Sequence, residues 1–181
     1  MPMAVTARRF SVDEILGWPD DGNRYELVDG VLLVTPAPVP VHQIVANRLA
    51  AALSTRLDRP DVYVASPGEI LIRPDLRMQP DVLVFRSESV PAKWEDIREH
   101  WLAVEVWSPS SVVYDREIKR DAYLQIGVRE VWLVDCERKA VLVSRPGALR
   151  DQVQEKSLLW RPPLRPETAP IDLTEVFRGL E

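Results

Sequence analysis

The most constraining feature of the sequence is a strand-like run that is apolar on both faces. It spans residues 102–107 (Leu-Ala-Val-Glu-Val-Trp), and residues 130–136 form a second run of this kind. Side chains alternate between the two faces of a strand, so such a strand needs cover on both faces of its sheet. The sequence therefore predicts a buried sheet in a layered α/β domain.

Periodicity and turn chemistry predict the remaining elements. Ser11 and Glu14 form a capping box that starts a short helix ending near Trp18. The pair Asp29–Gly30 lies between two apolar runs, which is a strong hairpin signal. In chain order the predicted elements are a helix at 11–18, strands at 24–28 and 31–35, a helix at 41–57, strands at 62–66, 69–72, 81–85 and 101–107, a helix at 114–126, strands at 130–136 and 140–144, and a helical turn at 173–177.

This order of elements predicts the architecture. A helix, three strands, a second helix and another strand in succession indicate a mixed central β-sheet flanked by helices. An N-terminal helix and a β-hairpin precede this core. We expect a single domain over residues 1–181, with its core at about 24–144 and a peripheral C-terminal segment at 145–181.

The composition excludes several classes of protein. The chain has 181 residues, 46% of them hydrophobic, and its one cysteine, Cys136, has no partner within the chain. The apolar fraction is too high for a disordered protein, and no apolar run approaches the roughly 18 residues of a membrane span. Residues 1–9 lack the apolar core of a secretory signal. We therefore expect a protein of a reducing compartment, the cytoplasm, with no membrane partner.

The charge pattern further restricts the class of protein that this sequence can encode. The net charge of −5 argues against a non-specific nucleic-acid coat protein, which is usually strongly basic. It leaves room for an enzyme that gathers carboxylates around metal ions and keeps arginines at its rim. Nearly all positive charges are arginines, and lysines occur only at positions 93, 119, 139 and 156.

Asp81 and Glu105 stand at positions that stability alone does not explain. Asp81 lies between Pro80 and an apolar run, where it either binds a ligand or caps the chain after the proline. Glu105 lies inside the apolar run described above, on the face shared by Ala103 and Trp107. A buried carboxylate needs a positive partner, because desolvating its charge costs several kcal/mol. That partner is an arginine in a structural ion pair, or else a metal ion or a lysine.

Lys119 lies on the apolar side of the helix predicted at 114–126. At about 100° per residue, it falls in the same arc as Asp115 and Tyr123. Asp115 and Lys119 are either an ordinary ion pair one helical turn apart, or Lys119 faces Glu105 across the sheet. The second arrangement is geometrically possible, because the helix follows the Glu105 strand after a short loop and can pack against the sheet.

Several short motifs occur in a fixed order between about residues 10 and 144. They are Tyr25-Glu26-Leu27-Val28-Asp29-Gly30, the helix that begins near His42, Pro80-Asp81, Val104-Glu105-Val106-Trp107-Ser108-Pro109-Ser110-Ser111, Tyr114-Asp115, Lys119, and Gly127-Val128-Arg129-Glu130-Val131-Trp132-Leu133-Val134-Asp135. Their combination resembles the Uma-type family of bacterial restriction-endonuclease-like proteins, in the PD-(D/E)XK nuclease superfamily.

The resemblance implies a restriction-endonuclease-like core in which Asp81 and Glu105 bind a divalent metal, Mg²⁺ or Mn²⁺. In the superfamily pattern, a lysine two residues after the glutamate polarises the attacking water or stabilises the charge of the transition state. That position is Trp107 here, and the resemblance implies that Lys119 supplies the lysine from the following helix. Mg²⁺ prefers carboxylate and water oxygens, which suits this set of residues.

Two further residues are candidates for the site. Glu26 lies on a predicted hairpin strand, on the side of Arg24, and the resemblance makes it an additional metal-binding or neighbouring carboxylate. An exposed hairpin glutamate explains Glu26 equally well. His42 lies on the same helical face as Leu49, where a satisfied core histidine is the more common explanation.

Together these features predict an endonuclease that hydrolyses nucleic acid, DNA according to the resemblance, as a homodimer or higher homo-oligomer. Two alternatives stay open: a non-catalytic nucleic-acid-binding module, suggested by Trp107 and the acidic balance, and a metal-dependent hydrolase of a small phosphoester. The exposed strand of the hairpin at 140–144 or the tryptophan-bearing C-terminal segment would supply the interface between copies.

Overall fold

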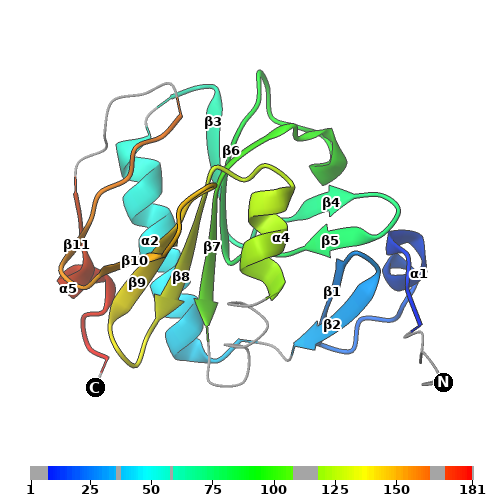
Figure 1. Cartoon of the computed structure of the whole chain (residues 1–181), viewed down its shortest axis with the longest axis horizontal. Helices are drawn as coiled ribbons and strands as arrows, with labels where there is room; N and C mark the ends of the chain where they lie inside the picture. The colour runs from blue at the N-terminus through cyan, green and yellow to red at the C-terminus, as the bar shows by residue number, and fades with distance from the viewer. Residues whose placement is uncertain (1–7, 36–37, 58, 108–117, 164–169, 181) are drawn as a thin grey trace.

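The computed structural model describes residues 8–35, 38–57, 59–107, 118–163 and 170–180. Within these residues the strands form a six-stranded, a four-stranded and a two-stranded sheet (Figure 1). The architecture is α/β with a mixed central sheet, as the order of predicted elements indicated.

The six-stranded sheet is the centre of the molecule. Its strands, in spatial order, are β10 (Gln152–Gln154), β9 (Ala140–Ser144), β8 (Glu130–Asp135), β7 (Glu99–Trp107), β6 (Val82–Arg86) and β3 (Val62–Ala65). β7 and β8 are parallel, and the other neighbours are antiparallel. The prediction that β9 is an exposed strand available for an interface is wrong, because β10 pairs with its outer edge.

The four-stranded sheet contains the predicted hairpin. Its order is β2 (Val31–Thr35), β1 (Arg24–Val28), β5 (Leu76–Met78) and β4 (Ile70–Ile72). The hairpin turn has positive φ at both Asp29 (49°) and Gly30 (75°), which is the type I′ geometry that twists with the strands. β5 was not predicted: in this strand Arg77 stands between Leu76 and Met78, and three residues give little alternation to read.

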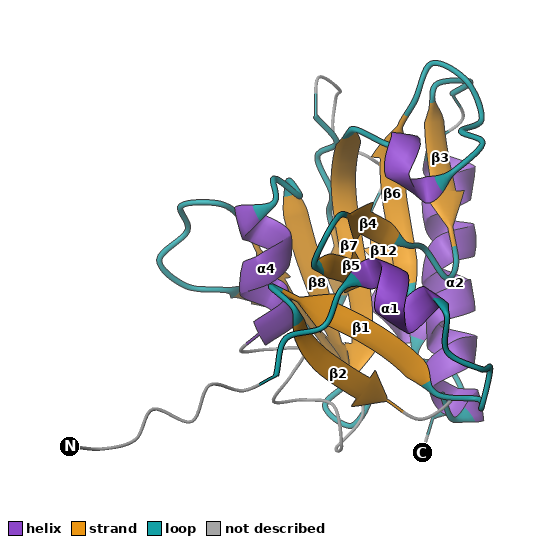
Figure 2. Ribbon diagram, turned by 90° about the vertical axis from the view of Figure 1, so that its right-hand side faces the viewer, coloured by secondary structure: helices purple, strands orange, loops and turns teal. Residues whose placement is uncertain are grey.

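Helices cover both faces of the central sheet. The described helices are α1 (Val12–Leu16), α2 (Pro40–Arg56), the 3₁₀ turn η1 (Trp94–Asp96), α4 (Arg120–Gln125) and α5 (Leu173–Val176). Figure 2 shows the central sheet between α2 on one side and α4 on the other, with the small sheet in front. Residues 114–117 of the helix predicted at 114–126 lie outside the described residues, and Lys119 stands immediately before α4.

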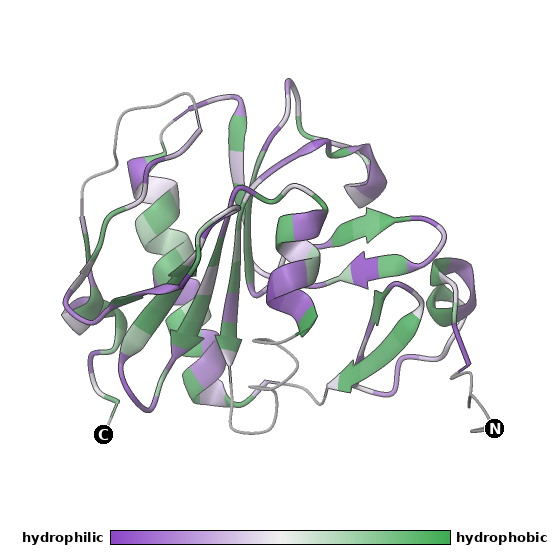
Figure 3. Cartoon of the chain, in the orientation of Figure 1, coloured by the Kyte–Doolittle hydropathy of each residue, from purple (hydrophilic) through white to green (hydrophobic). Residues whose placement is uncertain are grey.

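Two apolar clusters lie on opposite faces of β7. Val104 and Val106 pack with α2, while Ala103 packs with α4 and the small sheet. The hydropathy colouring in Figure 3 shows the same concentration of apolar residues in the central strands. Glu105 therefore shares the α4 side with Ala103 and Trp107, and strand alternation had predicted that these three residues lie on one face.

Parts of the C-terminal segment, residues 158–160 and 171–177, pack into the core, so the prediction of a peripheral segment is wrong for these residues. β11 (Ser157–Leu158), β12 (Ile171–Asp172) and α5 complete the cover around α2. Trp160 is fully buried and meets Trp132 edge to face, with ring centroids 6.1 Å apart. Its burial rules Trp160 out as a surface anchor between copies. Sequence periodicity missed this packing because the apolar residues lie in pieces too short to show a pattern.

Within the described parts of the chain, no helix is long and apolar enough to cross a membrane.

Candidate active site

Four acidic and basic side chains from distant elements lie near the carboxyl end of β7. Glu105 belongs to β7, Asp81 immediately precedes β6, Glu26 lies in β1, and Lys119 immediately precedes α4. All four are buried. The β6–β7 register pairs Val82 with Val104, so the next step along both chains sets Asp81 opposite Glu105. The fold therefore places the sequence-predicted charged residues at one end of the sheet.

Lys119 lies between two carboxylates. Its Nζ atom is 2.7 Å from Glu26 Oε2 and 3.2 Å from Glu105 Oε1, and its side chain is only 4% exposed. Tyr123, one helical turn later, donates its hydroxyl proton to the same Glu105 oxygen at 2.6 Å. Lys119 thus faces Glu105 rather than bulk solvent, because two buried anions hold its ammonium group.

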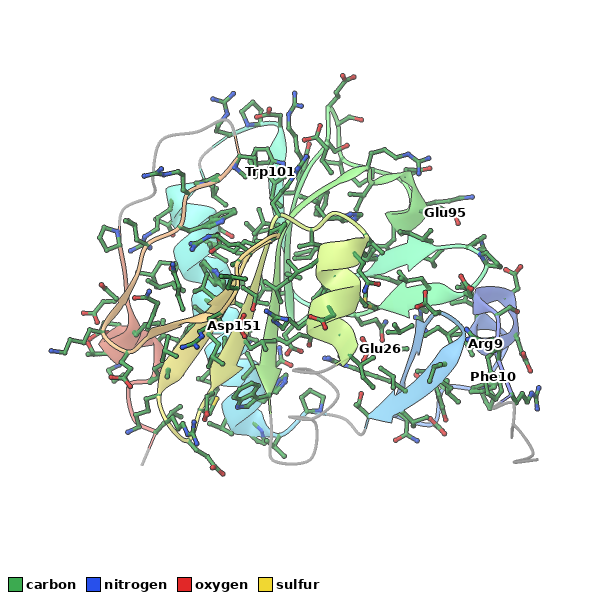
Figure 4. All side chains as sticks on the ribbon, viewed as in Figure 1. Arg9, Phe10, Glu26, Glu95, Trp101 and Asp151 are labelled. Atoms are coloured by element: carbon green, nitrogen blue, oxygen red, sulfur yellow. The ribbon has the colours of Figure 1, made fainter. Side chains whose placement is uncertain are left out.

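Arg120, the residue after Lys119, helps to explain why Lys119 points into the site. Arg120 turns the other way and donates hydrogen bonds to Asp151 Oδ1 (Nη2, 2.7 Å) and to Ser144 Oγ (Nε, 3.0 Å). Figure 4 shows Glu26 beside the lower end of α4 and Asp151 on the opposite side, toward β9 and β10. The start of α4 is therefore anchored on both sides, which fixes the direction of Lys119.

Glu26 is fully buried, so an exposed hairpin glutamate is excluded. Its Oε1 accepts a hydrogen bond from the backbone N–H of Gln79 at 2.7 Å. Among the described residues, Glu26 Oε2 accepts no well-directed hydrogen bond, and its 2.7 Å contact with Lys119 Nζ is an ion pair. Glu26 consequently ties the small sheet to the start of α4.

Asp81 is held by three donors. Arg24 Nη1 donates to Oδ1 at 2.9 Å, the Val106 N–H donates to Oδ2 at 2.8 Å, and His42 Nε2 lies 3.0 Å from Oδ2. Burial alone would raise the pKa of Asp81. The contacts with His42, Val106 and Arg24 outweigh burial, so its pKa lies below the usual value. The Asp81 carboxyl therefore stays ionised. It lies next to Val106, the residue that follows Glu105.

The loop before β4 fixes the backbone of Asp81. Ser66 Oγ donates to the Asp81 carbonyl at 2.8 Å, and the Gly68 N–H donates to the Pro80 carbonyl at 2.9 Å. A Cβ on Gly68 would meet Leu83 Cβ at 2.2 Å, so only glycine permits this approach. The position of Asp81 therefore depends on close backbone packing as well as on its side-chain partners.

His42 reaches the site from the first turn of α2. Its Nδ1 atom is buried and has no hydrogen-bond partner among the described residues. The contact of Nε2 with Asp81 shows that His42 is not simply a residue of the apolar face. Its ring orients one oxygen of the carboxylate.

Sequence reasoning missed two residues of the site, Arg24 and Tyr123. Arg24 precedes Glu26 by two positions on β1, and Tyr123 follows Lys119 by four on a helical arc. Both spacings put the missed residue on the same face as a candidate, and this signal could have found them. Trp107 is half-buried and packs against the apolar cluster on the α4 side.

The carboxylate oxygens of the site are the type of ligand atom that a hard divalent cation binds. Asp81, Glu105 and Glu26 offer carboxylate oxygens, which Mg²⁺ and Mn²⁺ prefer. Within the described residues, however, no three acidic, histidine or cysteine side chains converge as a ready-made metal cluster. Arg24 and Lys119 already balance much of the negative charge.

The comparisons with known proteins agree with this fold. The Uma2 family, described as "Putative restriction endonuclease", matches residues 12–181. A solved structure from Anabaena variabilis, described as a putative nuclease belonging to DUF820, has a TM-score of 0.69 at 18% identity, covering 95% of this chain and 99% of that chain. At this identity the likeness shows the fold alone. No curated protein matches the chain. Because the family match extends over almost the whole sequence, the chain belongs to the Uma2 family.

Proposed function

We propose that this protein is a metal-dependent endonuclease that hydrolyses phosphodiester bonds of nucleic acid, with DNA as the first substrate to test. The observation that carries the proposal is the buried ammonium of Lys119, 3.2 Å from Glu105 Oε1 and 2.7 Å from Glu26 Oε2. Removing one partner from a buried ion cluster is costly. A protein seldom needs such a cluster for stability alone. Membership of the Uma2 family and the nuclease-like fold support the same activity.

Asp81 and Glu105 are the proposed metal ligands. A bound Mg²⁺ or Mn²⁺ would supply the Lewis acid that lowers the pKa of a water molecule and offsets charge on the phosphate. Asp81 suits this role because its carboxyl stays ionised, and the Val106 amide and His42 hold its orientation.

Lys119 is the proposed electrostatic partner of the reacting phosphate. Its ammonium is fixed by Glu26 and Glu105, so it needs no reorganisation as negative charge develops. Tyr123 shares Glu105 Oε1 with Lys119 and thereby positions both groups. This arrangement supports Lys119 as the replacement for the lysine that the superfamily pattern has at the position of Trp107.

A non-catalytic nucleic-acid-binding module is the second candidate. The observation that favours it is the charge balance, because Arg24 and Lys119 already pair with the carboxylates. A binding module should bind DNA equally well with and without a divalent metal and should never cut it.

Cleavage assays distinguish the two candidates. Single- and double-stranded DNA and RNA are incubated with the protein in Mg²⁺, in Mn²⁺ and in excess EDTA. We expect cleavage by wild type with either metal, none with EDTA, and loss of cleavage in Mg²⁺ for Asp81→Ala. Asp61→Asn is the control, since Asp61 pairs with Arg59 and Arg86 away from this site. A protein that cuts no nucleic acid under any condition would contradict the endonuclease proposal.

Assembly into a dimer remains part of this proposal, because cutting two strands favours two sites. Of the central sheet, β10 and β3 are the outer strands. Size-exclusion chromatography with light scattering measures the mass, and a strictly monomeric protein would remove the dimer from the proposal.

A further inference from the structure

The charges around Asp81 are nearly balanced without a metal ion. Three buried carboxylates, Asp81, Glu105 and Glu26, lie near the cations Arg24 and Lys119. Arg24 is attracted by all three carboxylates, not by Asp81 alone. A divalent cation added to this arrangement would meet two positive groups at short range, so one of them must give way for tight binding.

Arg24 and Lys119 differ in how firmly they are held. Lys119 has two carboxylate partners among the described residues, and its side chain is 4% exposed. The Arg24 side chain is 23% exposed, and among the described residues its guanidinium donates to Asp81 only. Losing one contact with solvent nearby costs less than extracting an ammonium from two buried anions. Arg24 is therefore the cation that can leave.

A guanidinium that leaves Asp81 has an obvious alternative partner in a nucleic-acid substrate. Its planar fork matches two oxygens of a phosphate, which makes arginine well suited to phosphate binding. Arg24 lies on β1, two positions before Glu26, so it stays at the same end of the sheet when its side chain turns.

We propose that Arg24 neutralises Asp81 in the free protein and transfers to a substrate phosphate, as a substrate-binding residue, when a divalent cation binds. This inference rests on the proposed function and adds a regulation to it. Because Arg24 blocks the cation until phosphate offers it another partner, the cation and nucleic acid bind cooperatively. By linkage, each must raise the affinity for the other by the same factor.

The first test measures Mn²⁺ affinity without nucleic acid, by isothermal titration calorimetry. Arg24→Gln removes the competing charge, so we expect Mn²⁺ to bind at least about tenfold more tightly than to wild type. Arg24→Lys restores the charge and should restore the weak wild-type affinity. Arg73→Gln is the matched control, because Arg73 lies in the β4–β5 turn of the same small sheet but pairs with Asp13 and with Glu95 (Nε to Oε2, 3.1 Å). Its Mn²⁺ affinity should equal that of wild type.

The second test measures the coupling. A mixed-sequence DNA duplex is titrated with and without Ca²⁺, which takes the same oxygen ligands, and gels verify that the DNA stays intact. In wild type, DNA should raise the Ca²⁺ affinity, and Ca²⁺ should raise the DNA affinity equally. In Arg24→Gln the coupling factor should shrink several-fold, while Arg73→Gln keeps the wild-type value.

The outcomes separate this inference from the proposed function. If Asp81→Asn leaves Mn²⁺ binding unchanged, the proposed metal site is wrong. If Asp81→Asn abolishes binding but Arg24→Gln binds Mn²⁺ no more tightly than wild type, the metal site stands and the role of Arg24 is wrong. Absence of Mn²⁺ binding in both wild type and Arg24→Gln overturns both. Melting curves for each variant verify that it is folded.

Discussion

Lys119 Nζ lies 2.7 Å from Glu26 Oε2, closer than the 3.2 Å that separates it from Glu105 Oε1. The first carboxylate belongs to the small sheet and the second to the central sheet. One ammonium group therefore joins two sheets and the start of α4, so the candidate site is also a structural junction. Substitutions here should change both activity and stability, and the two effects have to be measured separately.

Glu26→Gln should destabilise the protein by about 1–3 kcal/mol, because it removes one of the two buried carboxylates that Lys119 contacts among the described residues. The amide can still accept the hydrogen bond from the Gln79 N–H. Urea denaturation measures the free energy of unfolding. Glu175→Gln is the control, since Glu175 pairs with Arg178 on the surface and should matter little. Equal losses in the two variants would contradict a stabilising role for Glu26.

Lys119→Ala should lower the cleavage rate by roughly 10²-fold or more while leaving metal affinity measurable, because lysine is not a ligand. Asp81→Ala and Glu105→Ala should weaken metal affinity, so excess Mn²⁺ should rescue them in part. Rates at increasing Mn²⁺ concentration, with DNA as substrate, separate the two kinds of defect. If Lys119→Ala cuts as fast as wild type, the proposed replacement lysine is wrong.

Tyr123→Phe should lower the free energy of unfolding by about 1–3 kcal/mol, because it deletes a buried hydrogen bond to the Glu105 side chain. The ring itself stays buried, so packing changes little. Tyr63→Phe is the matched control: its ring stacks on Phe85, and its hydroxyl has no hydrogen bond among the described residues. Chemical denaturation of both variants gives the comparison. A loss no larger than that of Tyr63→Phe would show that the Glu105 contact contributes nothing.

His100 should make stability depend on pH. Burial lowers the pKa of His100 from 6.5 to about 4. Between these values the unfolded chain binds a proton at His100 and the folded chain does not. The free energy of unfolding should therefore fall as pH falls from 6.5 toward 4, at up to about 1.4 kcal/mol per pH unit. Denaturation of wild type and His100→Leu across this range tests the sign. His100→Leu should show a flatter profile, and parallel profiles would contradict the buried neutral imidazole.

Local patterns predicted the elements whose signal lies within a few neighbouring residues. The hairpin of β1 and β2 has the predicted bounds, because an Asp–Gly pair between apolar runs admits few other turns. The predicted helix at 41–57 differs from α2 by one residue at each end. By contrast, β5, β10, β11 and β12 contain only two or three residues each, which is too short to show a period.

In the candidate site, too, some features were predicted from local sequence patterns and others were not. The sequence by itself determined that Glu105 shares a strand face with Ala103 and Trp107 and that Lys119 belongs to the apolar arc of its predicted helix, because backbone geometry sets both periods. It also required a positive partner for Glu105, because a desolvated carboxylate is too costly alone.

Only the tertiary structure decided which groups meet. Asp81 pairs with Arg24, 57 positions away in the chain, and the same packing joins Lys119 to Glu26. The same holds for Trp160, which is buried against Trp132 although its own segment shows no periodic pattern. Desolvation sets the need for a partner, but the identity of that partner depends on how separate elements pack, and no local period encodes that packing.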